Sequence, residues 1–92
     1  MLIYDMASDE KIDEWHAKLD AIDLDILDLL EKRMELSKKL GDYKKKRGFF
    51  LASKPRSEEA LQARIGKSDL NPEFVRELFE VIFKESERVQ KD

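Results

Sequence analysis

One apolar pattern in the N-terminal half of the sequence constrains the fold more than any other feature. From about Asp9 to Arg47, apolar side chains recur at alternating spacings of three and four residues, over more than four heptads. Such a seam is typical of a long helix that packs along a partner helix. At 1.5 Å per residue, this helix would be roughly 58 Å long. The seam positions are Ile12, Trp15, Leu19, Ile22, Ile26, Leu29, Arg33, Leu36, Leu40 and Tyr43.

The length of the chain limits what can cover this seam. With 92 residues, the chain is expected to form one domain. A domain of that size is only about half as long as the helix, so the helix cannot bury its seam against its own chain. We therefore expect a second copy of the chain as its partner. Residues 1–8 are short and mixed, so we expect a lead-in that need not be ordered, followed by a single helical domain over 9–92.

Glycine and proline divide the rest of the chain into two further helices. Gly48 is expected to end the long helix. A short second helix is predicted from about Lys54 to Gly66, with Pro55 in its first turn. Pro72 then occupies the first position of a third helix, of medium length. No strand pattern is visible, so the sequence predicts an all-α fold of three helices.

Each helix start carries a residue that can cap it. Ser8 or Asp9 precedes the long helix, Ser53 precedes the second and Asn71 precedes the third. Side chains of these types accept hydrogen bonds from the free backbone N–H groups of a first helical turn.

Composition excludes several classes of function. Net charge is −3 and acidic residues are interspersed among the basic ones along the chain, which argues against nucleic acid as the main partner. There is no Cys and only one His, His16, so a disulfide, a thiolate metal site and a histidine cluster are all excluded. We expect no cofactor. No apolar run is long enough to cross a membrane, and no secretory signal is visible, so a cytoplasmic location is expected.

Arg33 interrupts the seam, where every other position is apolar or aromatic. One interpretation is a buried ion pair or a polar residue that sets the register of paired helices. The other is an anion receptor, because a guanidinium grips a carboxylate through two parallel hydrogen bonds. The residue alone leaves both interpretations open.

Three more polar residues lie where they can join Arg33 or complete a similar site. Lys44 is eleven residues further on, roughly 16 Å along the same helix face, although the basic run around it is also typical of a solvated helix end. Ser86 and Gln90 are four residues apart and continue the apolar stripe of the third helix, unless that end frays.

His16 is seventeen residues before Arg33, about 25 Å along the helix, so it cannot share a site with Arg33 of its own chain. In an antiparallel dimer it can reach the partner's site. A lone histidine is also common on a surface or in packing.

Together these residues resemble the helical class of chorismate mutases over about residues 12–90. The order and spacing of several segments carry the resemblance, and no single motif is diagnostic. The matching segments are Leu19–Asp23, Leu27–Arg33, Lys44–Gly48, Arg56, Asn71–Val75 and Glu85–Gln90.

The resemblance implies an intertwined all-helical homodimer that converts chorismate to prephenate in aromatic amino-acid biosynthesis. It implies that Arg33 binds a carboxylate of this dianionic substrate, and that Lys44 and Gln90 face the ether oxygen of the breaking bond. Arg56 and Ser86 would complete the pocket around the substrate's carboxylate and ring.

The sequence departs from the family at three of its site positions. His16 stands where the family usually has an arginine donated across the dimer. Ser53 stands in place of an aspartate, and Ser57 in place of a glutamate that accepts a hydrogen bond from the ring hydroxyl. Ser57 can still accept this bond without charge, and Glu58 is an alternative. These changes predict lower catalytic efficiency.

The chemistry implied by the resemblance suits these residue types. The rearrangement is intramolecular and pericyclic, so it requires no nucleophile, metal or obligatory proton transfer. It needs a site that holds the substrate in a reactive shape and donors that stabilise the charge growing on the ether oxygen. Alternatives are an isochorismate pyruvate-lyase on the same scaffold, a weakly active or non-catalytic relative, and a plain helical interaction module with Arg33 as a register device.

Overall fold

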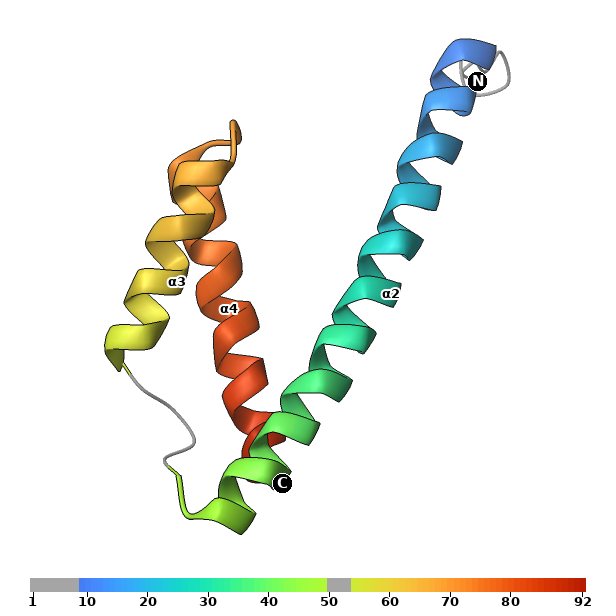
Figure 1. Cartoon of the computed structure of the whole chain (residues 1–92). Helices are drawn as coiled ribbons and strands as arrows, with labels where there is room; N and C mark the ends of the chain where they lie inside the picture. The colour runs from blue at the N-terminus through green and yellow to red at the C-terminus, as the bar shows by residue number, and fades with distance from the viewer. Residues whose placement is uncertain (1–8, 50–53) are drawn as a thin grey trace. The chain divides into compact units, whose positions relative to one another are not determined.

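The computed structural model describes residues 9–49 and 54–92 and contains three helices in this part of the chain (Figure 1). They are α2 (Glu10–Arg47), α3 (Lys54–Lys67) and α4 (Pro72–Lys91), and no strand is present in the described ranges. The all-α prediction of one very long, one short and one medium helix is therefore confirmed. None of the described helices is both long and apolar enough to cross a membrane.

Local signals set both ends of α2. Asp9 caps its start, because Oδ1 accepts hydrogen bonds from the backbone N–H groups of Lys11 at 2.8 Å and Ile12 at 3.4 Å. Its last turn is basic, which suits the negative end of the helix dipole. Gly48 follows with φ at +75°, and the N–H of Phe49 donates to the carbonyl of Lys44 at 2.9 Å. This is the left-handed glycine cap by which many helices end.

The helix α4 also begins where the sequence predicts. The side chain of Asn71 accepts a hydrogen bond from the N–H of Phe74 at 3.1 Å, and Pro72 opens the helix. The helix α3 begins at Lys54 and runs one residue beyond the expected stop at Gly66. Ser53, the predicted cap of α3, lies outside the described residues.

The chain divides into two compact units, residues 1–32 and 33–92, with the boundary inside α2. In the first unit, residues 10–32 form a single stretch of helix whose apolar seam faces solvent. The exposed fraction is 64% for Trp15 and 53% for Ile22, and Leu29 is exposed as well. This unit, taken as a single chain, buries none of the seam side chains that it contains.

The second unit holds the described core. The helices α3 and α4 pack side by side (Figure 1). Between them they contribute four buried apolar residues: Ala60, Leu61, Val75 and Ile82. The buried polar residues of the described part belong to this unit too, and they come from α2 and α4. The small apolar core and the buried polar groups together frame the candidate site.

Candidate functional site

Two buried serines join α2 to α4. The hydroxyls of Ser37 and Ser86 lie 2.6 Å apart and share a hydrogen bond. Ser86 Oγ also accepts a hydrogen bond from Gln90 Nε2 at 3.4 Å. All three side chains are buried. The predicted inward direction of Ser86 and Gln90 is therefore what the structure shows, and α4 continues through both of them to Lys91.

The close approach of the two helices depends on Gly41. A Cβ atom added to Gly41 would lie 2.7 Å from the Cα of Gln90 and 2.8 Å from its carbonyl oxygen. No real side chain tolerates such distances, so glycine is required for this crossing. The sequence interpretation missed this residue. The available signal was a glycine inside a helix, which costs about 1 kcal/mol relative to alanine and so suggests a packing reason.

The face of α2 that meets α4 differs slightly from the seam. Ser37 and Gly41 are buried, whereas Leu40 is 47% exposed and Leu36 is exposed as well. Of the seam positions, Arg33 is the one that is half-buried, and the apolar ones are exposed. The seam and the site therefore occupy adjacent stripes of one helix, and Arg33 belongs to both.

Arg33 is incompletely satisfied in this environment. Its guanidinium lies over the ring of Phe83, 5.6 Å from the ring centroid, and its buried Nη1 has no hydrogen-bond partner. Burial lowers the pKa of the Arg33 guanidinium, and the positive charge of Arg64 lowers it further. The group nevertheless stays protonated, as arginine does in proteins. A buried cationic donor without a partner is costly, and it can bind an incoming anion.

Gln90 supplies the second buried polar atom that lacks a partner, Oε1. Rotation of the amide by half a turn exchanges its oxygen and nitrogen without changing its shape. In that orientation Oε1 accepts from the Ser86 hydroxyl, and the NH₂ group becomes the free donor. The hydrogen bond between Ser37 and Ser86 permits this orientation, because either hydroxyl can be its donor. When Ser37 donates to Ser86, the Ser86 hydroxyl is free to donate to Gln90.

Arg64 of α3 joins this group, although the sequence interpretation did not assign it to the site. Its guanidinium lies 5.4 Å from the ring centroid of Phe79 and 5.3 Å from that of Phe83. Its Nη1 donates to the carbonyl of Ala60 at 2.8 Å. The signal that could have found it is the one that identified Arg33: a cation at an apolar position, here three and four residues after the buried Leu61 and Ala60.

The other predicted site residues are placed as follows. Lys44 is half-buried near the end of α2. Ser57, on α3, lines a shallow cavity of about 200 Å³ that Phe83 also lines. Arg56 lies in α3, but its side chain is outside the described part. The rest of the cavity lining is Glu58, Leu61, Glu80, Lys84 and Glu87.

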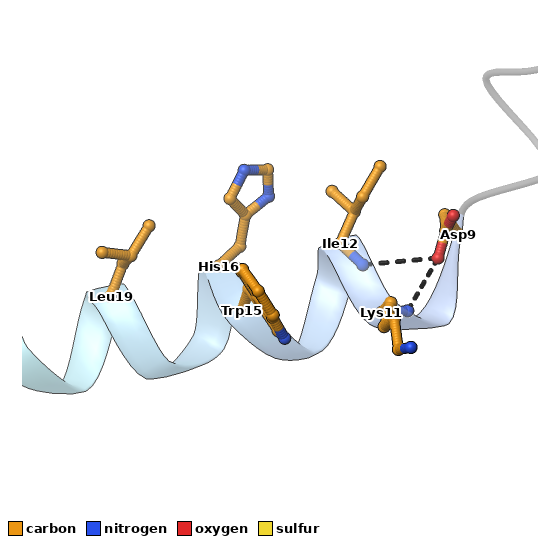
Figure 2. A pocket seen from close by; sticks show the side chains of 6 residues that line it. All are labelled: Asp9, Lys11, Ile12, Trp15, His16 and Leu19. Atoms are coloured by element: carbon orange, nitrogen blue, oxygen red, sulfur yellow. Dashed lines mark hydrogen bonds between the residues drawn. The ribbon is translucent and has the colours of Figure 1, made fainter.

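His16 lies in the first unit, on the exposed apolar face of α2. Figure 2 shows its ring on the same side of the helix as Ile12 and Leu19. Together with Asp9, Lys11 and Trp15, these residues line an open groove of about 410 Å³. The histidine is exposed and surrounded by apolar side chains.

The second unit therefore contains the kinds of group that the binding of an anion requires. Arg33, Arg64 and Lys44 supply positive charge, and the serines and Gln90 supply neutral donors. No group of three histidine, aspartate or glutamate side chains within 9–49 and 54–92 is placed to hold a metal ion.

Comparison with protein families matches residues 15–91 to the family described as chorismate mutase type II. The match runs through both units and includes every position of the candidate site. A solved structure, a conserved hypothetical protein from Pyrococcus furiosus, is similar with a TM-score of 0.75 and 31% sequence identity. The similarity covers 90% of this chain and 99% of that one. Comparison with curated proteins gave no match.

Proposed function

Because the chain belongs to the chorismate mutase type II family, we propose that it catalyses the intramolecular rearrangement of chorismate to prephenate. The observation that carries the proposal is the buried Nη1 of Arg33, a cationic donor with no partner in a unit that also holds the buried Gln90. A substrate carboxylate supplies both the charge and the acceptor that this guanidinium lacks.

The rearrangement breaks a carbon–oxygen bond and forms a carbon–carbon bond within one molecule. The protein accelerates it by holding the two reacting ends together and by stabilising negative charge on the ether oxygen. In this proposal Arg33 holds a carboxylate of the substrate. Lys44 and Gln90 donate to the ether oxygen, with the Gln90 amide in the orientation that frees its NH₂ group. Donors that are already fixed need little rearrangement as the charge develops.

The serines have separate roles in the proposed site. Ser86 holds the Gln90 amide and is itself held by Ser37, at 2.6 Å. Ser57 accepts a hydrogen bond from the substrate's ring hydroxyl, which its place beside Phe83 supports. Ser53 and Arg56 are proposed as further substrate-binding residues on the family resemblance alone. A neutral Ser57 is a weaker acceptor than a carboxylate, so modest efficiency is expected.

We also propose that two chains form an intertwined homodimer in which His16 of one chain enters the site of the other. The exposed seam supports this, since large apolar side chains of α2 face solvent in a single chain. A second copy of the same seam would cover them. Histidine in its charged form then adds a cation to the binding of a dianion.

A direct assay tests the proposed reaction. Purified protein is incubated with chorismate, chorismate loss is followed, and prephenate is identified as the product. Isochorismate is assayed in parallel, with pyruvate release as the readout of lyase activity. Pyruvate from isochorismate without prephenate from chorismate would assign the lyase reaction instead, and no turnover of either substrate would indicate a non-catalytic relative.

Arg33→Leu links this assay to the site. We expect kcat/KM to fall by about two orders of magnitude, equivalent to roughly 3 kcal/mol of lost binding to the transition state. The unliganded protein should be as stable as the wild type or more so, because no buried cation remains. Arg47→Leu is the matched control, since Arg47 is exposed and stacks on Tyr43. Equal activity of the two variants would remove Arg33 from the site.

A further inference from the structure

Arg33 and Arg64 lie against the same aromatic ring. The Arg33 guanidinium is 5.6 Å from the centroid of Phe83, and that of Arg64 is 5.3 Å from it. They approach from different helices, α2 and α3, and Phe83 belongs to α4. Phe79 extends the aromatic surface beneath Arg64, with its own ring 5.9 Å from that of Phe83. Three helices therefore bring two cations to one aromatic ring.

No negative charge of the described residues balances these two cations. The ion pairs of this part of the chain involve other residues, and neither guanidinium takes part in one. Arg64 donates to a neutral carbonyl, that of Ala60, and Arg33 leaves Nη1 without any acceptor. The cavity that Phe83 lines also carries three glutamates, Glu58, Glu80 and Glu87, but none of them pairs with either arginine.

This arrangement is unfavourable in the unliganded protein. Two like charges repel, and partial burial removes the water that would screen them. The lowered pKa of Arg33 agrees with this, because burial and the charge of Arg64 are its causes, in that order. The contacts with aromatic faces offset only part of this cost. An anion bound between the two guanidiniums would remove the repulsion and satisfy the buried Nη1.

We propose that Arg64 is a second substrate-binding residue, which grips a carboxylate of the bound dianion together with Arg33. The proposal rests on the proposed function and adds a residue to its site. A guanidinium presents several donors in a rigid plane, so two of them can hold one carboxylate from two sides. Contacts with Phe79 and Phe83 already restrict the Arg64 side chain, so less of its freedom is lost when the anion binds.

A substrate-binding role and a simple packing role of Arg64 predict different effects on protein stability and on substrate affinity when its charge is removed. Arg64→Met keeps an unbranched side chain that packs against both aromatic rings but removes the charge. We expect the melting temperature of the unliganded protein to stay the same or rise, because the repulsion with Arg33 is gone. The KM for chorismate should rise about tenfold, with kcat within about twofold of the wild type.

Two further variants complete this kinetic test. Arg64→Lys keeps the charge without the planar group and should give an intermediate KM. Arg47→Met removes the same charge from an exposed part of α2 and should leave KM unchanged. If Arg64→Met lowers the melting temperature and leaves KM as in the wild type, Arg64 is a packing residue and the proposal is wrong.

A binding experiment gives an answer even if the protein does not turn over chorismate. The wild-type protein is labelled with ¹⁵N-arginine and titrated with malonate, a small dicarboxylate, while the Nε–Hε signals are recorded by NMR. The Arg33 and Arg64 signals are assigned by their loss in Arg33→Leu and Arg64→Met. Both should shift along one binding curve, and the Arg47 signal should not move.

The outcomes distinguish this proposal from the proposed function. Shifts of both signals without turnover would support the paired site and contradict the mutase activity. Turnover with a shift of the Arg33 signal alone would support the activity and overturn the role of Arg64. If malonate shifts neither signal at concentrations that saturate a simple carboxylate-binding site, Arg33 and Arg64 do not form an anion-binding site and the proposal is wrong.

Discussion

Arg33 occupies a seam position of α2 and His16 lies next to the seam, yet their surroundings differ. Arg33 is half-buried against Phe83 with one donor unpartnered, whereas His16 is exposed beside Ile12 and Leu19. The unpartnered donor of Arg33 can be satisfied by a ligand bound within its own unit. The exposed His16 can contribute to a site only if another chain covers the apolar face on which it lies. The role of His16 in a partner's site therefore stays a prediction.

Replacing His16 by arginine tests that role. An arginine carries a permanent charge and a planar set of donors, which an imidazole lacks. His16→Arg should therefore increase kcat/KM at pH 7.5 by about fivefold, equivalent to roughly 1 kcal/mol.

His16→Gln is the matched control for this prediction, because glutamine keeps a polar side chain without a positive charge. Its kcat/KM should not exceed that of the wild type. Equal kcat/KM values for the wild type and both variants would show that His16 takes no part in substrate binding.

At the scale of elements, the position of α4 against α2 depends on small residues. Ser37 and Ser86 meet through their hydroxyls, and Gly41 lets the backbone of Gln90 approach closely. The local caps at Asp9, Gly48 and Asn71 follow from neighbouring residues and were readable in the sequence. The contact between the helices was not, because it joins residues about fifty positions apart.

A pair of glycine substitutions tests the crossing of α2 and α4. Gly41→Ala puts a methyl group 2.7 Å from Gln90 Cα, so the helices must move apart. We expect the steric overlap to lower the free energy of unfolding by about 1–3 kcal/mol. This loss outweighs the gain in helix propensity, which is up to about 1 kcal/mol. Catalytic activity should fall as well, since Gln90 moves with α4. Urea unfolding at a fixed protein concentration measures the change.

Gly66→Ala is the control, because nothing lies within 4 Å of the added methyl group and the residue lies within α3. The same propensity argument predicts that it stabilises the protein, by up to about 1 kcal/mol. Equal stability of the two variants would mean that Gly41 does not set the distance between α2 and α4.

At the scale of the whole molecule, one chain buries little apolar surface for its size. Four apolar residues of the described part are buried, and the seam of α2 remains exposed over both units. A single small domain with so small a core is marginal in stability. A second copy that covers the seam would provide the missing core, and it would also bring His16 to a site.

Ile22→Asp tests the proposed dimer. It places a charge in the middle of the seam, where Ile22 is 53% exposed in one chain. We expect the variant to sediment as a monomer at concentrations at which the wild type sediments as a dimer, and to melt at a lower temperature. The reason is that the dimer would bury an unpaired carboxylate.

Leu24→Asp is the control for Ile22→Asp, because Leu24 lies on the opposite side of the helix and is 66% exposed. A wild type that sediments as a monomer at all concentrations would contradict the dimer.

The sequence by itself predicted the three helices and the caps at Asp9, Gly48 and Asn71, and it named most of the candidate site residues, whose roles stay proposals. Periodicity, capping and helix breaking depend on residues within a few positions of each other, so they can be read along the chain. Arg33 was identifiable because a cation stood among apolar seam positions. The inward direction of Ser86 and Gln90 also followed from helical spacing alone.

Only the tertiary structure decided which stripe of α2 meets α4, that Gly41 is needed at the crossing, and that Arg64 shares the ring of Phe83 with Arg33. These features join α2, α3 and α4 through contacts between distant residues. Helical period places a residue on a face, but the fit of side-chain volumes between helices decides which face is covered. The sequence alone therefore identifies Arg33 as a cation among apolar positions. The structure shows in addition that Arg64 lies against the same aromatic ring.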